Sequence, residues 1–131
     1  MGKRQATFYE VSKFDADCIP HSTYCAYNFT VVPESSMFPT LCTAFLQGPD
    51  YLPAVTNGTC DNIAYTWTVN KLAEGGLNLT IKTPFNARLD LTGVHAIAAD
   101  EIELENNGAV RTQHYIGAAN FTVPITGTPS S

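Results

Sequence analysis

Hydrophobic and polar residues alternate with a period of two along most of this chain. In 24–32, Cys25, Tyr27, Phe29 and Val31 fall on one face, and the residues between them fall on the other. Successive side chains of a strand point to opposite faces, so this alternation predicts a half-buried β-strand. No window of about eleven or more residues shows the apolar spacing of an amphipathic helix.

The same alternation predicts strands at 64–70, 77–82, 87–92, 101–105 and 120–123, with further candidates at 7–14, 41–45 and 110–116. Turn-forming residues separate these runs, at Pro33, 48–49, Pro53, 57–58, 75–76 and 106–108. Asn107-Gly108 is the strongest turn signal, because both residues tolerate positive φ between apolar flanks. The segment 93–99 is the one stretch that indicates a short helical or irregular excursion.

Short strands with regular turns predict an all-β fold, a single-domain antiparallel β-barrel or β-sandwich. The length of 131 residues is that of one domain. We expect a flexible N-terminal start or processing remnant at 1–6, where Lys3-Arg4 resembles a dibasic processing site, a single β domain at 7–125 and a C-terminal tail at 126–131. No apolar run is long enough to span a bilayer.

The four cysteines, Cys18, Cys25, Cys42 and Cys60, predict two disulfides. Thiols stay oxidised only in an oxidising compartment, so the protein is expected to be secreted and extracellular. Pairing Cys18 with Cys25 and Cys42 with Cys60 is favoured because each bridge closes a local, turn-rich loop. Pairing Cys18 with Cys60 and Cys25 with Cys42 stays open. A zinc site is disfavoured because no C-x-x-C pair exists.

N-x-T sequons begin at Asn28, Asn57, Asn78 and Asn120 and are candidate glycosylation sites. At Asn28, Asn78 and Asn120 the Asn and Thr lie on the outward face of a predicted strand. The polar pattern of a wet sheet face therefore accounts for these three as well as glycosylation does. Asn57 lies in a predicted turn near Cys60 and is the stronger candidate.

The charge balance restricts the partners. There are 12 acidic and 7 basic residues, a net charge of -5, and no basic patch. Such a chain repels nucleic acid and anionic membranes, so neither is expected as a partner. The sequence contains no motif for a cofactor, and we expect none.

Catalytic residue types are present without a recognisable arrangement. A secreted nuclease would pair two of His21, His95 and His114, or one of them with Glu101 or Glu103, and would use Arg88 or Arg111 to hold a phosphate. No G-x-S-x-G elbow for a serine nucleophile is present.

The carboxylates also favour a structural interpretation. Glu101, Glu103 and Glu105 alternate with apolar residues, as on a solvated strand face. Asp15 and Asp17 are expected to solvate a loop or to make a weak contact with a cation. We therefore predict that the protein is not an enzyme.

The aromatic residues offer a second use, which is recognition. Trp67 falls on an apolar face with Tyr65 and Val69, so core packing is favoured over a sugar-stacking platform. Tyr51, between Pro49 and Pro53, is the better candidate for a recognition loop, because loops on a rigid sheet scaffold carry binding residues.

Segments 8–14, 18–22 and 25–31 together resemble small secreted fungal proteins known as hypersensitive-response-inducing elicitors, which look related to the major Alternaria allergen family. The resemblance continues loosely through Cys42, 52–53, 60–61, 77–81, 115–117 and 121–123. It implies a secreted all-β protein that plant tissue perceives as an elicitor of defence and cell death, with no established enzymatic activity and no catalytic residues to carry over.

The allergen branch forms a covalent dimer through an extra cysteine, and this chain has no cysteine left over. We therefore expect a monomer or a non-covalent dimer. The predicted function is a non-enzymatic fungal elicitor that recognises a plant surface or extracellular component. The alternative is an extracellular carbohydrate-binding or small-ligand-binding β-barrel.

Overall fold

Ten strands and one short 3-10 helix make up the part of the chain that this computed structural model describes, residues 7–20, 23–34, 36–48, 51–107 and 110–129. The strands are β1 (Phe8–Cys18), β2 (Tyr24–Pro33), β3 (Thr40–Gln47), β4 (Val55–Cys60), β5 (Thr66–Lys71), β6 (Leu77–Asn86), β7 (Leu89–Ile97), β8 (Ile102–Asn107), β9 (Val110–Tyr115) and β10 (Phe121–Pro129). The 3-10 helix η1 (Ala99–Glu101) precedes β8.

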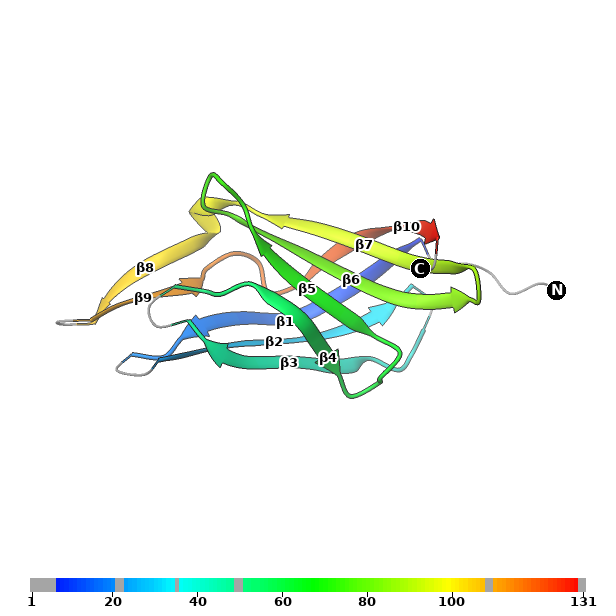
Figure 1. Cartoon of the computed structure of the whole chain (residues 1–131), viewed down its shortest axis with the longest axis horizontal. Helices are drawn as coiled ribbons and strands as arrows, with labels where there is room; N and C mark the ends of the chain where they lie inside the picture. Colours follow the sequence, from blue (N-terminus) through cyan, green and yellow to red (C-terminus); the bar gives the residue numbers. More distant parts are fainter. Residues whose placement is uncertain (1–6, 21–22, 35, 49–50, 108–109, 130–131) are drawn as a thin grey trace.

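Antiparallel pairing closes eight of these strands into a barrel. Strands β1 to β7 pair in sequence order, and β10 pairs with both β7 and β1. Strands β8 and β9 form a hairpin that joins the barrel through one pair, Asp17 of β1 with His114 of β9. Figure 1 shows this hairpin projecting at the end away from the carboxyl end of β10. The all-β prediction is confirmed, and the architecture is the barrel.

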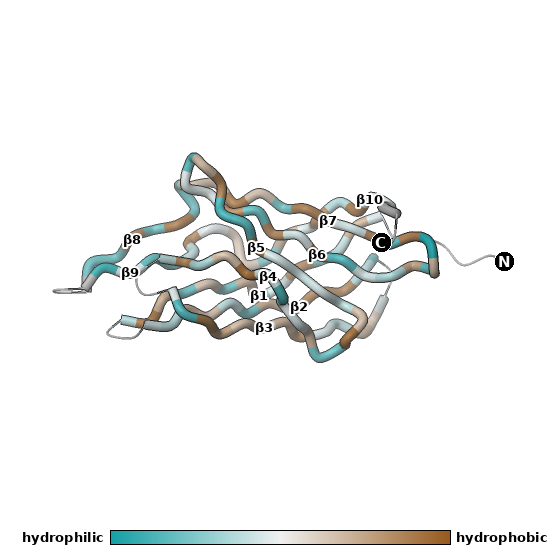
Figure 2. The backbone as a smooth tube through the Cα atoms, viewed as in Figure 1, coloured by the Kyte–Doolittle hydropathy of each residue, from teal (hydrophilic) through white to brown (hydrophobic). Residues whose placement is uncertain are grey.

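Side chains of the barrel strands fill its interior. Trp67 packs edge-on against Phe29 and Tyr27, with ring centroids 5.0 Å and 5.9 Å apart. Tyr9 donates a hydrogen bond to the Leu91 carbonyl at 3.0 Å, and its hydroxyl lies 2.6 Å from Thr83 Oγ1. Burial raises the pKa of Tyr9 to about 12. Figure 2 shows the alternation of hydrophobic and hydrophilic residues along the strands that produces this core.

A bulge in β1 reverses the face that its side chains occupy. Tyr9 and Val11 point inward before the bulge, and the even-numbered residues from Phe14 to Cys18 point inward after it. Lys13 lies at the bulge with φ 58°. Its N–H donates to Asn120 Oδ1, and the Phe14 N–H donates to the Ala119 carbonyl. The bulge therefore allows one long strand to contribute to the core along its whole length.

Strand β4 was not predicted, and the predicted turn at Asn57-Gly58 is wrong. Both residues lie within β4, where the pairing with β5 shifts register between Val55 and Gly58. A Cβ on Gly58 would lie 2.5 Å from the Trp67 ring. Glycine is therefore required here by the close approach of the tryptophan and not by a turn.

Other boundaries also differ from the predictions. Strand β7 continues to Ile97, so most of the expected excursion at 93–99 is regular strand. Strand β10 pairs with β7 as far as Pro129, so residues 126–129 belong to the barrel and not to a tail. Asn107 pairs with Val110, which places Asn107 in β8 and not in the turn.

The two disulfides join Cys18 to Cys25 and Cys42 to Cys60, as favoured from the sequence. The first joins paired residues at the end of the β1–β2 ladder. The second joins β3 to β4 near the other end of the β2–β3 ladder, where Cys42 pairs with Phe29. No helix in the described ranges has the length and apolar character that crossing a membrane requires.

Candidate functional site

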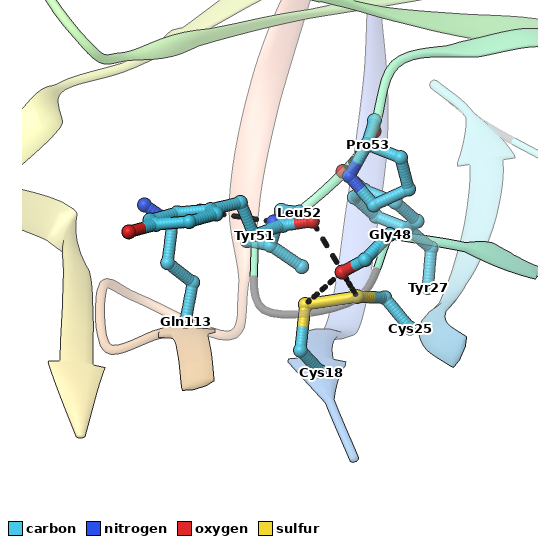
Figure 3. Close-up of a disulfide and its surroundings, with 8 residues drawn as sticks. All are labelled: Cys18, Cys25, Tyr27, Gly48, Tyr51, Leu52, Pro53 and Gln113. Atoms are coloured by element: carbon cyan, nitrogen blue, oxygen red, sulfur yellow. Dashed lines mark hydrogen bonds between the residues drawn. A yellow bond between two sulfur atoms is a disulfide. The ribbon is translucent and has the colours of Figure 1, made fainter. Parts of the chain in front are cut away.

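The segment between β3 and β4, which carries Tyr51, is anchored to the barrel at several points (Figure 3). Leu52 is buried, and its N–H donates to Gln113 Oε1 of β9 at 2.9 Å. The Tyr27 hydroxyl donates to the Pro53 carbonyl at 2.7 Å. The Tyr51 N–H donates to the Gly48 carbonyl at 3.0 Å. These contacts fix the position from which Tyr51 projects.

The Cys18–Cys25 disulfide lies directly beneath this segment. Cys25 Sγ is 2.9 Å and Cys18 Sγ is 3.6 Å from the Gly48 carbonyl oxygen. A disulfide sulfur carries no hydrogen, so these are close sulfur–oxygen contacts. A Cβ on Gly48 would lie 2.6 Å from the Tyr51 carbonyl oxygen and 2.7 Å from Pro53. Glycine therefore permits the segment to fold back closely over the disulfide.

Tyr51 itself is 54% exposed. It borders a surface hollow of about 170 Å³, which Leu72, Ile102 and Gln113 also line. An aromatic side chain held on an anchored loop beside a hollow is suited to contact with a partner. The assignment of Tyr51 to a recognition loop stays a prediction, made from the sequence and compatible with this geometry.

A second group of exposed apolar side chains lies on the outer face of β2 and β3. The rings of Tyr24 and Phe45 stack with centroids 4.8 Å apart and an interplanar angle of 7°. Phe45 is 64% exposed, and Leu41 lies on the same face of β3. Met37 and Phe38, in the β2–β3 connection, are also exposed. We refer to Tyr24, Leu41 and Phe45 as the β2–β3 apolar face.

An open seam borders this face. Strands β3 and β4 pair only at Cys42 with Cys60 and at Thr43 with Thr59, although β3 continues to Gln47. Figure 1 shows β4 running at an angle to β3. The gap forms a hollow of about 390 Å³, lined by Phe45, Asn57 and other residues that carry no charge. Sequence reasoning missed this seam because it did not predict β4.

Trp67 is not part of the surface. It is 1% exposed, and its Nε1–H donates to the Thr59 carbonyl at 3.0 Å. The expectation that Trp67 packs in the core is confirmed. A sugar-stacking surface would instead have to use exposed rings such as those of Tyr24, Phe38, Phe45 or Tyr51.

A titratable cluster lies where the β8–β9 hairpin meets β1. His114 Nε2 is 3.5 Å from Glu103 Oε1 and 3.4 Å from Glu105 Oε2. Burial, together with the hydrogen bond and the negative charge of Asp15, raises the pKa of Asp17 to about 6, although His114 acts in the opposite direction. Asp17, Glu105 and His114 line a hollow of about 340 Å³.

The chemistry of this cluster is limited. Glu103, Glu105 and His114 offer ligand atoms within 4.8 Å of one another, a set that metal ions accept. The glutamates are exposed, and ion pairing with a protonated histidine explains the same geometry. The sequence predicted a pairing of one of the three histidines with Glu101 or Glu103. The structure places His114 beside Glu103 and Glu105.

The other predicted catalytic groups do not join the cluster. His95 stacks on Phe121 with ring centroids 4.0 Å apart, and burial lowers its pKa. The Glu101 carboxylate accepts a hydrogen bond from the Ala98 N–H at 3.0 Å in η1. Arg88 lies in the β6–β7 turn, Arg111 pairs with Asn106 of β8, and His21 lies outside the described residues. A nuclease-like pairing of histidine with arginine is therefore not found in the described ranges.

The four sequon asparagines occupy different surroundings. Asn28 and Asn78 are half-buried on the outer face of β2 and β6, between neighbouring strands. Asn120 is exposed, but its Oδ1 accepts the hydrogen bond at the Lys13 bulge. Asn57 is exposed in the seam, where its Nδ2 makes only a 3.5 Å contact with Thr56. Their glycosylation stays a prediction.

The fold defines a class, the small closed β-barrel with two disulfides. A crystal structure of the Alternaria alternata major allergen Alt a 1 has the same fold, with a TM-score of 0.58 over 98% of this chain and 100% of that chain. The two sequences are 16% identical, so the likeness concerns the fold alone. No protein-family model and no curated protein matches the chain.

Proposed function

We propose that this chain is a secreted fungal elicitor that induces plant defence or hypersensitive cell death by recognition at its outer surface, without catalysis. The observation that carries the proposal is the distribution of aromatic residues. Trp67, Tyr9, Tyr27 and Phe29 fill the barrel, whereas Tyr24, Phe45 and Tyr51 are displayed outside it. Exposed aromatic side chains on a rigid scaffold are frequent anchors of protein interfaces.

Two further observations support secretion. All four cysteines are joined in two disulfides, which form and persist in an oxidising compartment. The fold is also that of Alt a 1, a fungal allergen. The proposed partner is a plant surface or extracellular component, and neither a cofactor nor a nucleic acid belongs to the proposal.

Leaf infiltration with the oxidised protein and surface variants tests the proposal. Tyr51→Ala and Phe45→Ala should each raise the protein dose for cell death by roughly 30-fold, the effect of a ~2 kcal/mol anchor. Val94→Ala, an exposed apolar residue on β7, is the matched control and should leave the dose unchanged. A response to reduced and alkylated protein equal to that of the native protein would contradict recognition of a folded surface, as would silence from both.

The second candidate function is extracellular carbohydrate binding. The parallel stack of Tyr24 and Phe45 beside the uncharged seam favours it, because a neutral sugar offers both an apolar face and hydroxyl groups. Pull-down on chitin, glucan and cellulose tests this candidate. Loss of binding in Phe45→Ala but not in Val94→Ala is expected if the stack is the platform.

A further inference from the structure

The seam between β3 and β4 leaves an exposed strand edge within the barrel wall. Barrels remove sheet edges by closing, and an unprotected edge invites pairing with another chain. Here the closure is incomplete, because β3 runs from Thr40 to Gln47 while its ladder with β4 ends at Thr43. The Gly48 N–H donates to Thr23 on the β2 side. In an antiparallel strand alternate residues direct their hydrogen-bonding groups to opposite sides, so those of Phe45 and Gln47 face the seam.

A sequon lies in the wall of this seam. Asn57-Gly58-Thr59 lies in β4, and both Asn57 and Thr59 line the hollow. Asn57 is exposed, and within the described part of the chain the atom that would carry a glycan, Nδ2, has only the 3.5 Å contact with Thr56. The other three sequon asparagines lie outside the seam, and none of them lines the hollow.

The lining of the hollow matches a neutral saccharide. Thr43, Thr56 and Thr59 contribute hydroxyl groups, and no charged residue takes part. Phe45 contributes an exposed ring that is held in place by its stack on Tyr24. The volume of about 390 Å³ is within the range of small-molecule sites, roughly 300–1,000 Å³.

We propose that Asn57 carries an N-linked glycan whose first sugar residues lie in the β3–β4 seam, against Phe45, and cover the exposed edge of β3. The proposal rests on secretion, as proposed above, because disulfides and N-glycans are formed in the same pathway. The glycan closes the part of the barrel wall that the ladder leaves open. It also separates that edge from a second copy of the chain.

Secretion of variants from a eukaryotic host tests this proposal. Thr59→Val removes the sequon without changing Asn57 or the backbone carbonyl that Trp67 uses, and Thr59→Ser retains the sequon. Thr80→Val removes the sequon at Asn78, on the outer face of β6, as the matched control. Peptide mass spectrometry should find the Asn57 glycan in the wild type and in Thr59→Ser, and should not find it in Thr59→Val.

Two physical measurements then test the position of the glycan. Hydrogen exchange of the Phe45 and Gln47 amides should be about tenfold faster in Thr59→Val than in the wild type, and sedimentation velocity should show concentration-dependent dimers for Thr59→Val alone. An unmodified Asn57 in the secreted protein overturns the proposal. A glycan whose loss changes neither exchange nor association also overturns it, because the sugar would then project into solvent.

Pull-down on chitin, glucan and cellulose distinguishes the source of the saccharide. Binding by Thr59→Val and not by the wild type supports a seam that its own glycan occupies. If the secreted wild type has an unmodified Asn57 and binds one of these polysaccharides, the seam is a site for an external polysaccharide. That result overturns the proposal that a glycan on Asn57 occupies the seam. The effect of Tyr51→Ala in the leaf assay does not depend on the seam, because Tyr51 does not line it, so a failure here is distinguishable from a failure of the elicitor proposal.

Discussion

Removal of the Cys42–Cys60 disulfide should open the barrel at its weakest ladder. The two cysteines form one of only two residue pairs between β3 and β4. Both cysteines should be replaced by alanine and not by serine. Cys42 is fully buried, and a serine hydroxyl at this position would lose water without a prepared hydrogen-bond partner.

The magnitude follows from the length of the closed loop. The residues are 18 apart in sequence, which corresponds to about 3 kcal/mol of unfolded-state entropy. The residues of the Cys18–Cys25 bridge are 7 apart, which corresponds to about 2 kcal/mol. For a domain of this size, 3 kcal/mol lowers the melting temperature by roughly 10 °C. The ladder of β3 with β4 should weaken in addition.

Urea unfolding and hydrogen exchange measure the two parts of this prediction. Cys42→Ala with Cys60→Ala should lose more free energy of unfolding than Cys18→Ala with Cys25→Ala. It should also lose amide protection in β4 before β6 and β7. An equal or smaller loss of stability, or a uniform loss of protection, would refute the view that this bridge holds the seam together.

Two further substitutions test the burial described above. The pKa of Asp17 is raised from 3.8 to about 6, so the folded state binds a proton more tightly than the unfolded state, and stability falls as the pH rises through this window. The full shift would be worth about 3 kcal/mol, and solvent screening at this half-buried carboxyl reduces our expectation to about 1 kcal/mol. Asp17→Asn should therefore raise the free energy of unfolding at pH 7.5 and leave it unchanged at pH 3.5. The exposed control Asp61→Asn should change it at neither pH. An equal gain in stability at both pH values for Asp17→Asn would contradict the argument. Gly58→Ala should cost about 2–3 kcal/mol in urea unfolding, because its Cβ would overlap the Trp67 ring, and unchanged stability would contradict the packing.

The period-two pattern was sufficient to predict the class of fold and most strands, because the residues of a half-buried strand alternate between the apolar core and the solvent. It failed where a bulge changes the register. In β1 the alternation breaks at Lys13, so the predicted strand ended near Phe14 although the real one continues to Cys18. Lysine is an uncommon residue at positive φ, so its identity carried no signal of a bulge.

The sequence did not decide which glutamate lies opposite His114, because the two candidate pairings differ by a shift of two residues in one ladder. A turn at Asn107-Gly108 would pair Glu101 with His114. The observed pairing of Asn107 with Val110 instead brings Glu103 opposite His114. Turn propensity alone does not fix which two residues form the loop of a hairpin. A shift of two residues also keeps each side chain on the same face of the strand, so the alternation did not show which glutamate lies opposite His114.

The position of the disulfides relates the fold to the surface on which the proposed function depends. The Cys18–Cys25 bridge contacts the segment that displays Tyr51. The Cys42–Cys60 bridge lies in the paired part of β3 and β4, at the closed end of the seam that Phe45 borders. The barrel core around Trp67 has its own packing and contains neither of these exposed residues. The disulfides therefore contribute in two ways. They restrict the unfolded chain, and they hold in place two surface regions that pair little with the rest of the sheet. A β-barrel whose interior is filled has only its surface with which to act, and here the covalent links lie beside the parts of that surface that offer contacts.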